Sequence, residues 1–229
     1  MRTRVKICCI ASLEEAQLAV RAGADAVGLI SVGALPSSPR AIADDVVAAI
    51  AAAVPVATFL LTSEDTAAGI ARRVSVAGTS AVQIVSHLNP SESAQLPKLL
   101  PTTRRVQVIH VENAGALDLI APYAPHVHTF FLDSGRPFLP SPEYGGSGRT
   151  HDWSVSAEFV RRSPLPVFLA GGLTPDNVGE AMRVVRPFGV DLCSGVRTDG
   201  RLDRAKLEAF IAAVRRADAE LSSRPTEVR

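Results

Sequence analysis

Two side chains that can exchange protons close apolar runs far apart in the sequence. Cys8 closes the run VKIC near the N-terminus, and Asp133 closes the run FFLD. A thiol and a carboxylic acid act as base and acid in proton transfer when their surroundings adjust their pKa values. Each also has an ordinary structural interpretation, because a strand cysteine often only fills a core and an aspartate can cap a turn.

Two glycine-containing turns and one arginine could hold an anionic substrate. Gly171 and Gly172 follow one apolar run, and Ser194 and Gly195 follow another. Glycine allows a phosphate to approach the backbone closely, and exposed N–H groups then bind it. These glycines could equally serve only as turn residues. Arg40, which follows a proline, could bind an anion or face solvent.

The rest of the chain alternates short β-branched runs with Ala-rich amphipathic stretches. Eight strands and eight helices in strict alternation predict right-handed βαβ units, and the count favours an α/β fold of the (β/α)₈ barrel (TIM barrel) class over an open doubly wound sheet. The predicted strands are Val5–Cys9, Ala26–Ser31, Val56–Leu61, Ala81–Val85, Arg105–Val111, Val127–Leu132, Pro166–Ala170 and Val190–Cys193. The predicted helices are Ser12–Ala22, Ala43–Ala53, Ser63–Ala77, Pro90–Leu100, Ala114–Tyr123, Ser154–Arg162, Pro175–Val185 and Asp203–Ala217.

A barrel of this kind gathers its functional residues at one end. They lie at the C-terminal ends of the strands and in the loops that follow, and loops seven and eight usually hold phosphate. The alternation therefore places Cys8, or its neighbour Cys9, together with Arg40 and Asp133 at the same face as the glycine turns. His87, in the fourth loop, lies at that face too.

The chain length fits one domain. We expect residues 1–218 to form the barrel and residues 219–229 to form a polar, frayed C-terminal tail. The long irregular stretch Asp133–His151 follows the sixth strand, so it should lie at the catalytic face.

Composition limits the partners that the chain could have. A net charge of +1 gives no reason to expect nucleic acid or a membrane as the partner. Three cysteines without metal-ligand spacing do not predict a disulfide framework or a zinc site. No apolar stretch is long enough to span a bilayer, and the N-terminus lacks the pattern of a signal peptide, so a cytoplasmic location is expected.

Several strings together resemble the phosphoribosylanthranilate isomerases in order and spacing along nearly the whole chain. The strings are VKICCI, SPRAI, AVQ, FLDS, EYGGSGRTHDW, LAGGLTPDNV and RPFGVDLCSGV, and the segment from Tyr144 to Gly195 is the most specific. This family folds as a (β/α)₈ barrel. The resemblance implies Cys8 as general base, Asp133 as general acid, Arg40 as the ligand of the anthranilate carboxylate, and Gly171, Gly172, Ser194 and Gly195 as the phosphate site.

The implied reaction is the Amadori rearrangement of tryptophan biosynthesis. Asp133 would protonate the furanose ring oxygen, and Cys8 would then remove the C2′ proton. The family chemistry implies no metal and no organic cofactor, and the chain is expected to act as a monomer or homodimer. Lys6, which shares a strand face with Cys8, is a candidate for a positive group near the thiol.

Four positions depart from the family pattern. Cys9 replaces a glycine, and strand alternation predicts that its side chain points away from the face of Cys8. The family's histidine after the fourth strand is lost at Val85, with His87 two residues later, and Arg197 replaces a glutamate. Loop two, Ser31–Pro39, is longer than usual.

Three other functions therefore stay open. The chain could isomerise a different phosphoribosyl amine, or it could be a non-catalytic barrel that only binds a phosphosugar. Binding alone needs neither Cys8 nor Asp133, which favours an enzyme. An epimerase or synthase of the phosphosugar barrels would place a lysine or paired aspartates at strand ends, and the sequence pattern does not indicate them.

Overall fold

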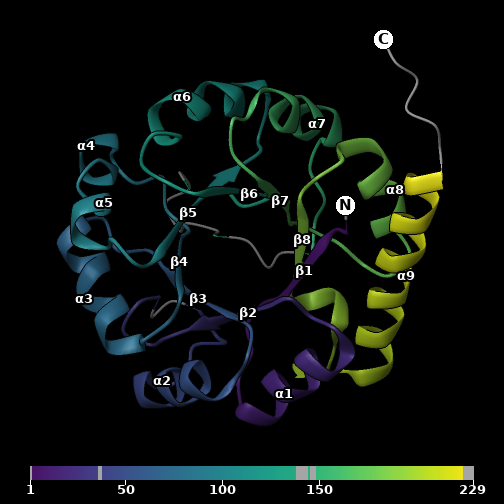
Figure 1. Ribbon diagram of the computed structural model, residues 1–229, viewed down its shortest axis with the longest axis horizontal. Coiled ribbons are helices and arrows are strands. Elements are labelled where there is room, and N and C mark those ends of the chain that lie inside the picture. Colours follow the sequence, from purple (N-terminus) through teal and green to yellow (C-terminus); the bar gives the residue numbers. More distant parts are fainter. Residues whose placement is uncertain (1, 36–37, 138–143, 145–147, 224–229) are drawn as a thin grey trace.

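Eight parallel strands close into a barrel in chain order (Figure 1), which confirms the predicted (β/α)₈ architecture. The computed structural model describes residues 2–35, 38–137, 144 and 148–223. The strands are β1 Arg4–Ile7, β2 Ala26–Ile30, β3 Ala57–Thr62, β4 Ala81–Ile84, β5 Arg104–His110, β6 Thr129–Asp133, β7 Val167–Leu169 and β8 Gly189–Leu192. The surrounding helices are α1 Leu13–Ala22, α2 Asp44–Ala53, α3 Ala67–Ala77, α4 Pro90–Ser93, α5 Leu96–Leu99, α6 Ile120–Tyr123, α7 Trp153–Arg162, α8 Val178–Val185 and α9 Arg204–Ser223.

Two predicted helices are divided in the structure. The stretch Pro90–Leu100 forms α4 and α5, because Pro97 has no N–H group and is accommodated only in the first turn of a new helix. The stretch Ala114–Tyr123 begins as the 3₁₀ helix η1, Ala114–Leu119, and continues as α6.

The last helix is longer than predicted. Helix α9 continues past Ala217 to Ser223, because Leu221 still packs against the core. The tail expected at 219–229 therefore begins inside this helix, and residues 224–229 lie outside the described residues.

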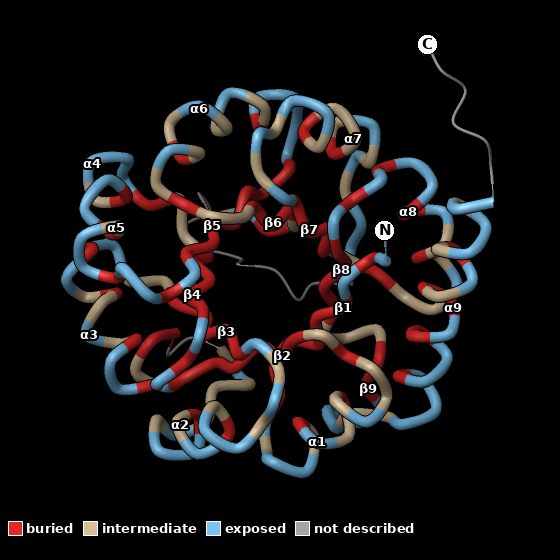
Figure 2. Tube along the Cα trace, viewed as in Figure 1, coloured by how far each residue is buried: buried red, intermediate tan, exposed pale blue. Residues whose placement is uncertain are grey.

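Buried residues lie along the strands and on the sides of the helices that face them (Figure 2), and their side chains form two clusters. The larger cluster lies between the strands and the helices, and it includes Val5, Leu60 and Phe210. The second fills the inside of the barrel, where Phe131 stacks on Phe168 with ring centroids 4.6 Å apart. The inside of the barrel is thus a packed core and not a pore.

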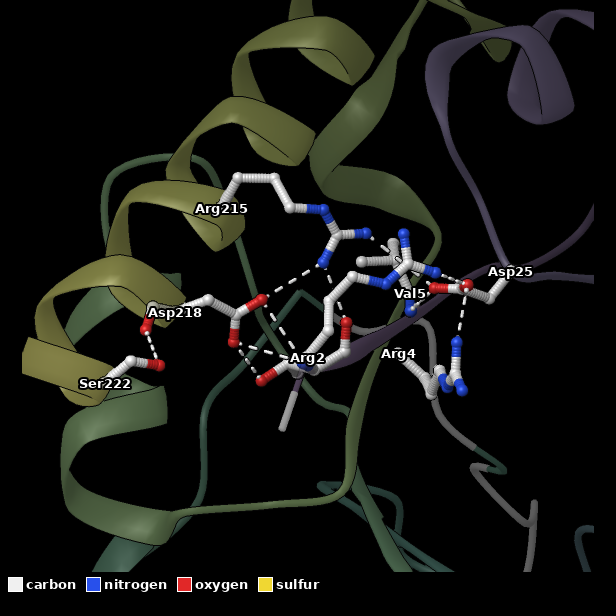
Figure 3. Close-up of polar contacts among 8 residues, drawn as sticks. Arg2, Arg4, Val5, Asp25, Arg215, Asp218 and Ser222 are labelled. Atoms are coloured by element: carbon white, nitrogen blue, oxygen red, sulfur yellow. Dashed lines mark hydrogen bonds and ion pairs between the residues drawn. The ribbon is translucent and has the colours of Figure 1, made fainter.

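At the N-terminal ends of the strands, polar contacts join β1, Asp25 just before β2, and α9 (Figure 3). The Asp25 carboxylate accepts the backbone N–H of Val5 at 2.9 Å and pairs with Arg2 and Arg4. From α9, the Arg215 guanidinium lies 3.8 Å from Asp25. Asp25 therefore joins the first strand to the last helix.

We predict that Asp25→Ala lowers the free energy of unfolding by about 1–3 kcal/mol, since the buried N–H of Val5 loses its acceptor. Urea denaturation measures this change. Glu208→Ala is the matched control, because Glu208 pairs with Arg204 in an exposed salt bridge and its loss should cost less than about 1 kcal/mol. Equal losses of unfolding free energy in both variants would contradict the role of Asp25 as the acceptor that joins β1 to α9.

Candidate active site

A cavity of about 400 Å³ opens at the C-terminal ends of the strands. All of the predicted site residues line it except Gly195, which packs against loop seven: a Cβ there would lie 2.2 Å from the Leu173 carbonyl oxygen. The lining residues include Cys8, Cys9, Ile30, Leu35, Arg40, Leu61, Gln83, Asp133, Tyr144, Gly171, Gly172, Asp191, Cys193 and Ser194. The predicted loop Asp133–His151 contributes Tyr144 and Gly148, whereas residues 138–143 and 145–147 lie outside the described residues.

A buried ion pair lies beneath the cavity. Lys6 has no solvent contact, stands opposite Asp191 in the register of β1 and β8, and places its Nζ 2.9 Å from that carboxylate. The same Nζ lies 5.5 Å and 5.3 Å from the ring centroids of Phe59 and Phe131. Burial by itself would lower the pKa of Lys6, but Asp191 and Cys8 raise it above the usual range, so the ammonium stays charged.

Cys8 lies just past β1, with its sulfur within hydrogen-bonding reach of the Lys6 ammonium. Glycine at position 28 makes room for both groups. A Cβ on Gly28 would lie 2.7 Å from the Cys8 Sγ and 2.8 Å from the Lys6 Nζ. The proximity of Lys6 and Cys8 that the sequence suggested is therefore present.

Two carboxyl groups line the same cavity. Burial raises the pKa of Asp133 to about 6, opposed by hydrogen bonds from Ser134 and by the charge of Lys6. Burial also raises the pKa of Asp191 to about 6, with Lys6 opposing and Asp133 contributing to the increase. The sequence pattern does not indicate paired aspartates, yet barrel closure brings these two together, and either can hold a proton near neutral pH.

Loops seven and eight form an anion-binding surface. Gly171 and Gly172 have φ angles of 81° and 63°, which favour glycine. A Cβ on Gly172 would also lie 2.6 Å from the backbone of Arg149, so loop six packs directly on it. Within the described residues, the backbone N–H groups of Gly172, Ser194 and Gly195 donate to no protein acceptor. Such N–H groups can bind a phosphate.

Arg40 reaches the cavity from loop two. Its Nη1 donates to the Cys193 Sγ at 2.7 Å. Cys9 faces the cavity as well, so the prediction that it points away from Cys8 is wrong. The reason is that β1 ends at Ile7 and Cys9 adopts a φ angle of 62°, so strand alternation does not extend to it.

Comparison with known proteins identifies the family. Residues 5–213 match the family model described as N-(5'phosphoribosyl)anthranilate (PRA) isomerase. The chain belongs to this family. N-(5'-phosphoribosyl)anthranilate isomerase 2 of Methanosarcina mazei is 36% identical over 211 residues, with 91% of this chain and 92% of the relative covered.

Solved structures agree with this assignment. Phosphoribosyl anthranilate isomerase from Thermotoga maritima has a TM-score of 0.78 at 31% identity, covering 93% of this chain and 98% of its own. A second PRA isomerase structure, in complex with reduced 1-(o-carboxyphenylamino)-1-deoxyribulose 5-phosphate, has a TM-score of 0.76 at 28% identity and covers 93% of this chain and 98% of its own.

Arg197, one of the departures from the PRA isomerase pattern, has a structural role here. The Arg197 guanidinium is buried, donates to the Cys9 carbonyl at 2.5 Å and pairs with Glu15 at 3.1 Å. Glu15 also accepts the backbone N–H of Leu202 at 2.8 Å. Arg197 is absent from the cavity lining and instead holds the left-handed backbone of Cys9 in place.

The fourth loop differs from the family pattern in another way. His87 is not among the cavity-lining residues; it stacks on His110, with ring centroids 5.4 Å apart. Burial and the neighbouring His110 lower the pKa of His87 to about 4. The His110 Nε2 lies 2.8 Å from the Val85 carbonyl oxygen. His87 therefore does not take the place of the missing family histidine at the cavity.

Two features were missed in the sequence although signals for them exist. Asp191 is the one charged residue in the otherwise apolar strand β8, which marks it as functional or paired. The hairpin β9 Arg197–Thr198 and β10 Arg201–Leu202 turns at Asp199-Gly200, a dipeptide typical of tight hairpins.

We predict that Arg197→Met lowers the free energy of unfolding by about 1–3 kcal/mol, because it leaves the partly buried Glu15 without its cation and the Cys9 carbonyl without its donor. Chemical denaturation measures the loss. Adding Glu15→Gln should recover part of it, and Arg201→Met, an exposed position in the same hairpin, should stay within about 0.5 kcal/mol of the unaltered protein. A similar cost for Arg197→Met and Arg201→Met would contradict this role.

Proposed function

We propose that this chain isomerises N-(5-phosphoribosyl)anthranilate to 1-(2-carboxyphenylamino)-1-deoxyribulose 5-phosphate, a step of tryptophan biosynthesis. The observation that supports it best is that Cys8, Asp133 and two glycine-containing loops line one cavity in a PRA isomerase fold. A related PRA isomerase binds a reduced form of this product.

The cavity has a chemically distinct region for each part of the substrate. The phosphate is proposed to bind the N–H groups of Gly171, Gly172 and Ser194, with Gly195 fixing loop eight by its contact with Leu173. The anthranilate carboxylate is proposed to pair with Arg40, whose guanidinium gives a directional fork of donors. Ile30, Leu35 and Leu61 provide an apolar wall for the aromatic ring.

Asp133 is proposed to act as the general acid. Its raised pKa keeps a fraction of the carboxyl protonated near neutral pH, so it can donate a proton to the furanose ring oxygen. The C1′–ring oxygen bond then breaks, and the amine nitrogen supplies the electron pair that forms a Schiff base.

Cys8 is proposed to act as the general base. Its sulfur, beside the Lys6 ammonium, removes the C2′ proton and gives an enolamine, which tautomerises to the ketose product. Asp191 holds Lys6 beside the thiol through their 2.9 Å ion pair, so it is a positioning residue in this account.

The cytoplasmic location and the monomeric or homodimeric state stay predictions. Across the described ranges, every helix is too short or too polar to cross a membrane. Those same residues include no cluster of three or more His, Cys, Asp and Glu side chains suited to a metal ion.

We predict that Cys8→Ser and Asp133→Asn each lower kcat by about 10²–10⁴-fold, because each removes one proton-transfer group. Loss of phosphoribosylanthranilate fluorescence measures turnover, and Glu208→Ala, far from the cavity, serves as the control. Near-normal turnover in either variant would contradict its role. Tight binding of the product analogue without turnover in the unaltered protein would favour a phosphosugar-binding barrel instead.

We predict an alkaline decline in kcat/KM. The pKa of Asp133 is raised to about 6, so the carboxyl stays protonated up to that pH and loses its donor proton above it. Because Asp133 and Asp191 interact, the apparent value belongs to the pair. A pH profile between 5 and 8.5 measures the decline, and a flat profile over this range would contradict an acidic role for Asp133.

A further inference from the structure

Three thiols meet where the first and last strands join. Ile7 of β1 lies opposite Leu192 of β8, so Cys8 and Cys193 follow directly at the open end of the barrel. The left-handed backbone of Cys9 directs its side chain into the same cavity. All three cysteines are free, and Cys9 and Cys193 lie close enough in this cavity for each thiol to shift the pKa of the other.

Cationic groups surround one of these sulfur atoms. The Arg40 Nη1 donates to the Cys193 Sγ at 2.7 Å, and the charge of Arg197 acts on the same sulfur. The Cys9 hydrogen bond and these two cations lower the pKa of Cys193 to about 7, against the opposing effects of burial and Asp191. Bonding to Cys193 and Cys8 raises the pKa of Cys9 well above its usual range, so Cys9 keeps its proton and is the donor.

The proposed isomerase chemistry uses neither Cys9 nor Cys193. It does use Arg40, which in this structure bonds the Cys193 sulfur and in the proposed complex binds the substrate carboxylate. The thiolate and the carboxylate therefore compete for one guanidinium. Cys193 is only half-buried and lines the cavity, so a small oxidant can reach it when no substrate is bound.

We propose that Cys193 and Cys9 form a peroxide-sensitive thiol pair in the active-site cavity, and that a bound substrate carboxylate protects it. The protection, but not the pair, rests on the proposed function. Hydrogen peroxide is the oxidant. A thiolate with cationic neighbours and access to solvent is the form of cysteine that such oxidants attack.

The chemistry balances in two steps. The Cys193 thiolate attacks one oxygen of hydrogen peroxide: an S–O bond forms, the O–O bond breaks, and the leaving hydroxide takes up a proton to become water. The Cys9 sulfur then attacks the Cys193 sulfenic acid, the S–S bond forms, and the S–O bond breaks. The Cys9 proton leaves with the hydroxide as a second water, so peroxide has accepted two electrons from the pair.

The test follows the thiols directly. The full-length protein is treated with hydrogen peroxide, alkylated with iodoacetamide and mapped by peptide mass spectrometry. We expect a disulfide between Cys9 and Cys193, reversed by dithiothreitol, with Cys8 still alkylated. Loss and recovery of turnover should follow the disulfide. A Cys8–Cys193 disulfide, or Cys9 and Cys193 still free after the treatment, would overturn the proposal.

Variants separate the two roles within the pair. Peroxide should leave the turnover of Cys193→Ser at that variant's own untreated level, whereas Cys9→Ser should stop at a Cys193 sulfenic acid that dimedone traps. Cys8→Ser, the matched control, should still form the Cys9–Cys193 disulfide although it lacks the proposed base. Unchanged peroxide sensitivity of turnover in Cys193→Ser would overturn the assignment of Cys193 as the reactive thiol.

Protection by a ligand connects the pair to Arg40. Iodoacetamide should alkylate Cys193 with a pH midpoint near 7. Saturating reduced 1-(o-carboxyphenylamino)-1-deoxyribulose 5-phosphate should slow this alkylation at least about tenfold. The carboxylate of the bound analogue occupies the Arg40 guanidinium, which then no longer stabilises the Cys193 thiolate. Bound analogue without slower alkylation would overturn the competition for Arg40. No binding of the analogue, with the disulfide still formed, would refute the proposed function and leave the thiol pair standing.

Discussion

The buried ammonium of Lys6 is the constraint on which the rest of the site depends. An ion without solvent contact is costly unless an opposite charge lies close and other groups complete its bonding. Here Asp191 supplies the charge at 2.9 Å, and two aromatic rings and the Cys8 sulfur surround the remainder. The same cation opposes the effect of burial on Asp133. One buried charge therefore acts on both proposed proton-transfer groups.

Closure of the barrel and assembly of the site are the same event. Lys6 and Asp191 meet only because β1 pairs with β8, the first strand with the last. That junction also brings Cys8, Cys9 and Cys193 to the open end, and at the other end Asp25 and Arg215 join β1 to α9 (Figure 3). A barrel that failed to close would lose its ion pair, its thiols and its proposed base together.

Much of this could be predicted from the sequence, because it depends on local pattern. Alternation of apolar runs predicted eight strands, and the residues at their ends, such as Asp133 and Gly172, indeed line one cavity. The rest depends on contacts between distant parts of the chain. Arg197 pairs with Glu15 across 182 positions, and no local pattern indicates that partner. The direction of the Cys9 side chain depends on the residue at which β1 ends. Strand alternation alone does not determine that residue.

Two of the departures from the family pattern, Cys9 and Arg197, form one arrangement. Cys9 stands at a left-handed position where glycine is usual, and Arg197, in place of a glutamate, bonds its carbonyl. Arg197 is in turn neutralised by Glu15 at the start of α1. Two substitutions that look unrelated along the sequence thus meet at one turn beside the proposed base, where Arg197 bonds the backbone that Cys9 strains, and neither removes a group that the isomerase chemistry uses.

The most direct test of this account is the pH profile of kcat/KM in Lys6→Met. Folding can be verified below about pH 6, where both cavity carboxyls can take up protons in place of the missing cation. The account predicts a folded protein whose kcat/KM falls at least about tenfold, the effect of roughly one pKa unit of lost charge interaction. Its alkaline limb should move to higher pH, because the cation that lowers the pKa of Asp133 is gone. A folded variant with normal kcat/KM and an unmoved limb would contradict the central role of Lys6.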